Sequence, residues 1–367
     1  MIKLKSFFKF IYKQLIKYLF FLLYGKISIS NNLENSVQIQ TLNKSKIKKF
    51  NNKNYKICNI KNGRICTDGV EQVAYISENK IIKNFSYTQI KGNLVSPNKN
   101  FVINRGTPYF LKKFNGVVLS LAQGASGNHN YFHWMFDILP KIKIVTSYYN
   151  IKDIDYFYMP EIQNYQKKIL DRLGIKKIKF INSNKYKHIQ ASQIIVPEHP
   201  WYFKGKIYED VNKLPKWIIN WLRSSFLKKF KSKSNVGKLF IDRSESKYNH
   251  CKLINNNKVI YELKKKSFKI IQVGKLSFKE QIRLFSNAKI IIGPHGAAFT
   301  NLVFCKPKTK IIEFRPFGHT GKNYKRISKI NNLKYNSIVS SKKYLNNHKG
   351  DIYVHIKDLE KKLKKKI

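Results

Sequence analysis

The feature that most constrains the fold is an alternation of strand-like and helix-like patterns in the second half of the chain. The apolar runs 237–243, 268–274, 290–293 and 309–316 alternate with amphipathic, helix-like stretches. The stretch 277–289 is the clearest of these, since Ser277 and Glu280 have the spacing of an N-terminal capping box. Because alternating strands and helices form parallel sheets covered by helices, we expect an α/β fold here.

The first half of the chain predicts a second α/β layer. Strand patterns at 153–159 and 177–181 flank a helix pattern at 161–175, and another strand pattern follows at 191–200. Shorter strand-like pieces precede them, namely 72–82, 101–106 and 116–122. We therefore predict the domains 1–26 (basic amphipathic helix), 27–220 (α/β), 221–330 (α/β) and 331–367 (basic tail with a helix). Residues 27–60 are expected to be irregular, and residues 205–236 to form a helical bridge.

The charge of the chain is strongly positive. It carries 72 Lys and Arg against 20 Asp and Glu, a formal net charge of +52. Such a surface attracts phosphates, anionic lipids or acidic polymers. The alternative is compositional, because abundant Lys, Asn and Ile are also what an AT-rich coding sequence produces. No helix-turn-helix, RNP or zinc-finger pattern is present, so we expect no specific nucleic-acid partner.

The N-terminus predicts a helix that lies on a membrane surface. Lys5, Lys9, Lys13 and Lys17 recur every four residues, with Phe, Ile and Leu on the rest of the helix. The uninterrupted apolar run 18–24 is too short to cross a bilayer, and no small-residue cleavage site follows it. The four cysteines show no C-x-x-C pair, which favours a reducing compartment. We expect a cytoplasmic protein, peripheral on the inner face of the membrane. The alternative is a helix packed on the protein's own body.

The stretch 290–304, IIIGPHGAAFTNLVF, predicts a ligand site. A buried strand ends at Gly293, where the missing side chain lets another group approach. The following small residues begin a helix whose exposed amides favour a phosphate, at the sheet edge where α/β folds bind ligands. His295 lies beside that site. The alternative is a glycine-rich turn with a structural histidine. The predicted ligand-binding residues of this turn are Gly293, Gly296, Ala297, Thr300 and Asn301.

A second candidate group lies on a predicted helix over 127–145. His129, His133 and Asp137 follow at intervals of four residues and so share one helix face. Asp137 can orient His133, which could then act as a general base. Two histidines at this spacing could also hold a metal, but no further ligand is evident. The alternative is a histidine that is hydrogen-bonded for structural reasons.

Three weaker signals complete the candidates. Arg243 directly follows a strand and suits bidentate phosphate binding, although a surface ion pair is the alternative. Glu313 ends the strand after the His295 turn, where a carboxylate can accept hydrogen bonds from a ribose. Asp153 and Asp155 form a D-x-D, which metal-dependent sugar transferases use, but here it more simply begins a strand.

Taken in order, three segments resemble glycosyltransferase family 61: NYFHWMFDILPKI (130–142), LFIDRS (239–244) and the stretch 277–316. The G-x-H-G-A-x-x-T-N core of the last is the most specific. The resemblance covers about 101–316. It implies a GT-B-like α/β fold in which two Rossmann-like domains face each other across a cleft. The C-terminal domain would bind the nucleotide sugar and the N-terminal domain the acceptor.

The resemblance also implies an activity, namely inverting, metal-independent transfer of a hexosyl or pentosyl group. Bacterial family members that resemble this chain are linked to the assembly of capsule, lipopolysaccharide or other surface glycans. We therefore expect a nucleotide-sugar donor as co-substrate, no cofactor, and a glycan or lipid-linked glycan acceptor. One departure affects the donor contacts. After Arg243 the chain reads CKLINN, in which Lys252 stands in for a basic residue of the family and Asn256 replaces an acid.

The expected mechanism places a base at the acceptor hydroxyl and fixed positive dipoles at the leaving nucleotide. His133, oriented by Asp137, is the favoured base, and His295 is the rival. The Arg243 side chain and the amides that follow Gly293 would stabilise the leaving group in place of a metal. Two alternatives remain: a non-enzymatic basic protein that binds nucleic acid or an acidic polysaccharide, and an inactive transferase-like scaffold.

Overall fold

The computed structural model divides into two compact units. Unit 1 is Met1–Ile207 and unit 2 is Tyr208–Ile367. The structure describes residues 2–29, 35–41, 50–51, 53–69, 71–90, 92–122, 129–227, 236–246, 250–345 and 349–364. The division falls earlier than the boundary expected after residue 220, because helix α8 (Lys216–Leu227) packs on other helices of unit 2.

Unit 2 is built on a five-stranded, fully parallel sheet with the strand order β14-β13-β15-β16-β17. Its strands are β13 (Gly237–Ile241), β14 (Phe268–Ile271), β15 (Ala288–Pro294), β16 (Lys310–Arg315) and β17 (Lys334–Val339). Numbered along unit 2, this is the order 2-1-3-4-5 of doubly wound α/β folds. After β13 the chain adds β14 on one side of it and then β15 on the other side. The strand order therefore switches between β13 and β15, and folds of this kind bind ligands at the carboxyl ends of such a pair.

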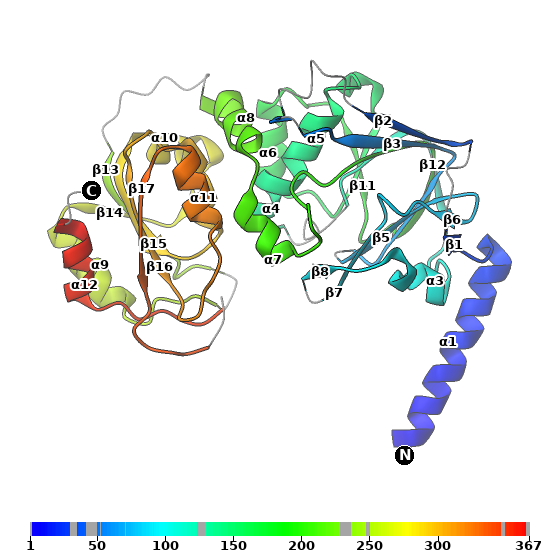
Figure 1. Ribbon diagram of the computed structural model, residues 1–367, viewed down its shortest axis with the longest axis horizontal. Coiled ribbons are helices and arrows are strands. Elements are labelled where there is room, and N and C mark those ends of the chain that lie inside the picture. Colours follow the sequence, from blue (N-terminus) through cyan, green and yellow to red (C-terminus); the bar gives the residue numbers. More distant parts are fainter. Residues whose placement is uncertain are drawn as a thin grey trace. The chain divides into compact units, whose positions relative to one another are not determined.

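Helices cover both faces of this sheet, as Figure 1 shows. Helices α9 (Asn256–Lys265) and α12 (Ile356–Lys364) pack on one face. The other group contains α8, α10 (Phe278–Asn287), the 3-10 helix η8 (Ala297–Phe304) and α11 (Asn323–Ile330). The short helices α7 (Ile207–Asp210), η6 (Val211–Lys213) and η7 (Val273–Lys275) complete the unit. The predicted capping box is confirmed, since Ser277 and Glu280 bond reciprocally at the start of α10.

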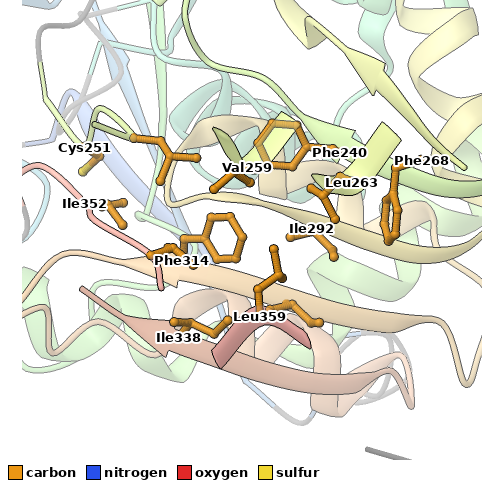
Figure 2. Packing of buried hydrophobic residues seen from close by; sticks show 13 residues of the cluster. Phe240, Cys251, Val259, Leu263, Phe268, Ile292, Phe314, Ile338, Ile352 and Leu359 are labelled. Carbon is orange, nitrogen blue, oxygen red and sulfur yellow. The ribbon is translucent and has the colours of Figure 1, made fainter. Parts of the chain in front are cut away.

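The apolar cluster under α9 and α12 explains why residues beyond 330 belong to this fold. Alternate residues of the strands, such as Phe240 and Ile292, point into it and meet Leu263 of α9 and Leu359 of α12 (Figure 2). The segment predicted as a separate tail therefore supplies β17 at one edge of the sheet and α12 to its core.

Unit 1 contains a twelve-stranded sheet of mixed direction. The parallel pairs are β9–β10, β10–β11, β12–β9 and the short pair β1–β6, whereas the remaining pairs are antiparallel. The prediction of a second Rossmann-like domain is thus only partly right, because β-hairpins form much of this sheet. Its strands are β1 (Ser28–Ile29), β2 (Val37–Thr41), β3 (Lys56–Lys61), β4 (Arg64–Thr67), β5 (Gln72–Ser77), β6 (Lys80–Ile81), β7 (Tyr87–Ile90), β8 (Asn93–Leu94), β9 (Lys112–Ser120), β10 (Tyr156–Met159), β11 (Lys179–Asn182) and β12 (His188–Pro197).

Two local predictions in unit 1 were wrong. The region 27–60 contains strands, since β2 pairs with β3. The segment 101–106, expected as a strand, begins with helix α3 (Phe101–Arg105), because the buried Asn100 caps its first turn by accepting from Val102 N. The other helices in the described residues of unit 1 are α1 (Ile2–Tyr24), η2 (Pro97–Lys99), α4 (Tyr131–His133), the π-helix η4 (Trp134–Ile138), α5 (Leu139–Val145), η5 (Ile151–Asp153) and α6 (Asn164–Arg172).

The described side chains of helix α1 that pack on the rest of unit 1 lie near its C-terminal end. Phe20 is buried and its ring meets Phe110, while Phe21 lies against Gly106. Figure 1 shows the rest of the helix extending beyond the strands of its unit. Within the described residues, the search for a helix long and apolar enough to cross a membrane found none.

Candidate active site

The ligand edge of unit 2 is formed where β13 and β15 end. Gly293, near the end of β15, lies so close to β13 that an added Cβ would be 2.7 Å from Ile241 Cβ and 3.1 Å from the Ile241 carbonyl oxygen. The glycine therefore permits a close approach of the two strands, as the sequence suggested. This contact fixes the position of the turn that follows, which carries His295 and Gly296.

Arg243 lies directly against this turn. Its Nη1 donates to the His295 carbonyl oxygen, and a Cβ on Gly296 would be 2.5 Å from the Arg243 Cζ. The first bond of η8 runs from Phe299 N to Gly296 O, so the amides just before Phe299 precede the intrahelical bonding. A guanidinium and amides at a helix start both favour an anion. The predicted Arg243 and Gly296 are thus in contact with each other.

The His295 side chain contacts the buried carboxylate of Glu313. Its Nδ1 lies 2.5 Å from Oε1 of Glu313, whose side chain is only 3% exposed. The hydroxyl of Tyr335 donates to the other carboxylate oxygen, Oε2. Burial and the neighbouring Glu313 charge raise the pKa of Tyr335 far above its usual value, so the phenol keeps its proton. Glu313 therefore serves as the partner of His295, and its predicted contact with a ribose stays a prediction.

A second histidine, which the sequence reasoning missed, completes this cluster. His319 follows β16 in the chain, and its Nε2 lies 3.2 Å from His295 Nε2. The Nη2 of Arg315 lies 2.7 Å from His319 Nδ1 and also donates to the Gly321 carbonyl oxygen. The ring of Tyr324, on α11, lies 5.3 Å from the His295 ring, centroid to centroid. No spacing rule links His319 to His295, because the contact depends on how the loop wraps around Arg315.

The remaining predicted donor residues differ in exposure. Thr300 and Asn301 are fully buried, and the Asn301 amide donates to Gln281 Oε1 at 2.9 Å. Ala297 is partly exposed at the start of η8. The Lys252 side chain is exposed, and within the described residues the bonds of this residue are those of its backbone.

The departure at Asn256 has a structural explanation. Its amide donates to Asp242 Oδ1 at 3.1 Å, and Asp242 also accepts from Ser244 and Gln272. An acid at position 256 would face the Asp242 carboxylate and repel it, whereas the amide stabilises it. This network holds the segment after β13 that carries Arg243.

In unit 1, the predicted pair of His133 and Asp137 is in contact. His133 Nδ1 lies 2.9 Å from Asp137 Oδ2, and the indole Nε1 of Trp201 donates to Asp137 Oδ1 at 2.8 Å. Asp137 is fully buried, whereas the His133 side chain is 21% exposed. The pair spans the start of the π-helix η4, a wide turn that often occurs at functional sites. With Nδ1 donating to the carboxylate, His133 Nε2 can accept a proton.

The charges around Asp137 are those of a buried site. Burial alone would raise the pKa of the Asp137 carboxyl, but the charge and hydrogen bond of His133 outweigh it and lower that pKa below its usual range. Burial lowers the pKa of the fully buried Lys141, one turn further on, to about 7, although the Asp137 charge opposes this. Burial also lowers the pKa of His199 to about 3. His199 Nε2 lies 3.7 Å from Asp137 Oδ2, too far for a hydrogen bond.

Two other sequence-based interpretations change. His129 lies before the helix with a φ of 55°, so it does not share a helix face with His133; the first turn of α4 is capped instead by Asn130, which accepts from Phe132 N. Asp155, from the D-x-D, accepts from the Val117 amide at 2.7 Å and so serves the sheet. In the described part of the chain, no three His, Cys, Asp or Glu side chains are grouped so that they could hold a metal.

The fold and this cluster define a class of protein: an α/β protein whose second unit is Rossmann-like, with charged and histidine side chains at its ligand edge. Comparison with known sequences gives the family. Residues 131–312 match the family described as Glycosyltransferase 61. A beta-1,2-xylosyltransferase, RCN11 of Oryza sativa subsp. japonica, is 35% identical over 63 residues, which are 17% of this chain and 12% of the rice protein.

Residues 131–312 are thus a glycosyltransferase family 61 domain. The matched range includes the His133–Asp137 pair, Arg243 and His295, whereas Glu313 is the first residue beyond it. The similarity to the rice enzyme is local, since it spans about an eighth of that enzyme's length.

Proposed function

We propose that the protein is an inverting glycosyltransferase that moves a sugar from a nucleotide-sugar donor to a glycan acceptor. The observation that carries this proposal is the contact of Arg243 with the Gly296 turn at the switch point of a parallel sheet, inside a glycosyltransferase family 61 domain. Donor binding is assigned to unit 2 and acceptor binding to unit 1, as in a GT-B arrangement.

The proposed reaction is a single displacement at the anomeric carbon. The acceptor hydroxyl attacks and loses its proton to a base, the bond from the anomeric carbon to the diphosphate oxygen breaks, and the nucleoside diphosphate leaves with the electron pair. Arg243 and the amides at the start of η8 would stabilise that charge, which is the role a metal has in other transferases.

The base is assigned to His133, with His295 as the rival. The His133–Asp137 contact keeps a proton on Nδ1 and presents Nε2, which is what a general base requires. His295 also has a carboxylate partner, Glu313, but it lies next to the anion-binding turn. A positively charged or donating group suits that place better than a base does.

We further propose that α1 holds the protein on an anionic membrane surface, where a lipid-linked or surface-glycan acceptor such as a capsule or lipopolysaccharide precursor would be assembled. The supporting observation is a set of large apolar side chains on α1 that lie in solvent. Those with an exposed fraction above one half are Phe7, Phe8, Phe10, Tyr12, Leu15, Tyr18 and Leu22. Such a face with lysines beside it suits an in-plane amphipathic helix.

The experiment that tests the proposal is a titration of the full-length protein with a panel of nucleotide sugars that includes UDP-xylose, with and without EDTA. We expect one donor to raise the melting temperature in a saturable manner, with no effect of EDTA, and Arg243→Ala to abolish the shift. If every donor fails with a folded protein while DNA or acidic glycans bind with strong salt dependence, the polyanion-binding alternative replaces the enzyme.

A further inference from the structure

A series of hydrogen bonds connects His295 and His319 with the residues on either side of them. It runs from Tyr335 to Glu313, from Glu313 to His295 at 2.5 Å, from His295 to His319 at 3.2 Å, and from His319 to Arg315 at 2.7 Å. The two imidazole rings lie 4.1 Å apart, centroid to centroid. His319 is brought here by a loop folded around Arg315, which donates to the backbone carbonyl oxygens of His319 and Gly321.

The residue types at the two ends assign a direction to the bonds between them. A guanidinium only donates, so the acceptor in the contact of Arg315 Nη2 with His319 Nδ1 is Nδ1, and Nη2 shares its two hydrogens among this nitrogen and the carbonyl oxygens of His319 and Gly321. The proton of neutral His319 is then on Nε2 and points to His295 Nε2, which must accept it. His295 therefore has its proton on Nδ1, where the Glu313 carboxylate accepts it. Each ring carries one proton, and both histidines are neutral in this arrangement.

One additional proton breaks the contact between the two rings. If it binds to His295 Nε2, two N–H groups face each other across the 3.2 Å gap. If it binds to His319 Nδ1, an N–H faces the Arg315 guanidinium. The pair thus has a neutral, connected state and a charged, separated state.

The other side chains that face His295 and His319 cannot take up the additional proton instead of these two histidines. Arg243 and Arg315 are guanidinium groups, which donate hydrogen bonds and do not accept them. Burial raises the pKa of Tyr324 and of Tyr335 far above its usual value. Burial also raises the pKa of Cys251, which lies near Arg243 and Glu313, to about 11. Glu313 accepts hydrogen bonds from His295 and from Tyr335.

We propose that His319 is a positioning residue for the donor site. It holds His295 neutral while the site is empty, and binding of a diphosphate at the Arg243–Gly296 turn separates the pair as His295 Nε2 takes up one proton from solvent. The proposal rests on the proposed donor site and deepens it. It makes His295 a donor to the diphosphate in the bound state. The ligand class is a nucleoside diphosphate ester, whose phosphates do not themselves titrate near neutral pH.

The test measures protons directly. Isothermal titration of the full-length protein with the nucleotide sugar that binds, at pH 7.5 in two buffers of different ionisation enthalpy, gives the number of protons taken up. We expect an uptake that approaches one for the parent protein. His319→Phe frees His295 Nε2 and should lower the uptake by at least half, whereas the exposed His355→Phe, on the same unit, should leave it unchanged. Equal uptake by parent and His319→Phe, or none by the parent, overturns the proposal.

A conservative variant separates this role from a purely structural one. His319→Gln can still donate an amide N–H toward His295 Nε2 but cannot titrate, so it should restore the neutral state of His295, and with it the proton uptake, that His319→Phe loses. Nitrogen-15 histidine spectra of the unliganded protein should show Nδ1–H on His295 and Nε2–H on His319. Spectra with the opposite His319 tautomer contradict the ordered chain even without ligand. If no nucleotide sugar of the panel binds, the proposed proton uptake on diphosphate binding fails together with the proposed function. The spectra of the unliganded protein still test whether the hydrogen bonds between Glu313, His295, His319 and Arg315 have the proposed directions.

Discussion

Replacing Gly296 by alanine is expected to separate ligand binding from folding. The new Cβ would lie 2.5 Å from Arg243 Cζ, whereas ordinary contacts are 3.4–4 Å, so the guanidinium must retreat by about 1 Å. Because the guanidinium is the flexible end of the Arg243 side chain, it can move away at the cost of its hydrogen bond to the His295 carbonyl oxygen. The free energy of unfolding should therefore fall by less than about 1 kcal/mol, the contribution of one hydrogen bond.

The expected loss in donor affinity is larger. A hydrogen bond to a charged group contributes about 1.5–3 kcal/mol, and about 1.4 kcal/mol corresponds to a factor of ten in Kd, so Gly296→Ala should weaken nucleotide-sugar binding about 10- to 100-fold. The matched control is Gly293→Ala, whose Cβ would meet Ile241 Cβ and backbone rather than a flexible end. It should destabilise unit 2 by about 1–3 kcal/mol, as overpacking does.

The assay is calorimetric titration of donor binding together with thermal unfolding of both variants. A double-mutant cycle decides the cause. If Gly296→Ala acts by displacing Arg243, it should weaken binding no further in an Arg243→Ala background. Additive losses, or parent-like affinity in Gly296→Ala alone, would refute the assignment of Arg243 to the diphosphate.

Three further predictions concern unit 1. Burial lowers the pKa of Lys141 from 10.5 to about 7, so between these pH values the folded protein binds fewer protons than the unfolded one. The stability of the parent relative to Lys141→Met should therefore rise with pH above 7, by up to about 1.4 kcal/mol per pH unit. Urea unfolding at pH 6.5, 8 and 9.5, with Lys143→Met as control, measures this difference, and a difference that does not change with pH contradicts the prediction. Asp137→Asn should lower turnover about 100-fold and leave donor Kd unchanged, since it impairs only the base; parallel losses would argue against that role. Leu15→Ser with Leu22→Ser should release the protein from anionic vesicles in a sedimentation assay, and unchanged binding would exclude α1 as the anchor.

The sequence predicted unit 2 well because its signals are local. Apolar strands, the Ser277–Glu280 capping box and the Gly293 turn each depend on neighbouring residues, and all three appear in the structure. The contact of His133 with Asp137 was predicted for the same reason, because four-residue spacing brings two side chains together on a helix.

What could not be predicted depends on long-range contacts. The antiparallel part of unit 1 pairs β12 with β3 and β4, from far earlier in the chain, and no local pattern encodes that register. The same holds for Trp201, which reaches Asp137 across 64 positions, and for His319, which reaches His295 through a loop. The prediction of a helical His129 failed because the helix begins two residues later, behind the Asn130 cap.

A structure of the full-length protein with its nucleotide sugar bound would show directly where the donor lies. We expect the diphosphate beyond the ends of β13 and β15, with Arg243 and the amides after Gly296 donating to its oxygens, and His295 within hydrogen-bond distance. A donor bound elsewhere, such as at the opposite end of the unit 2 sheet or within unit 1, would contradict the proposed donor site.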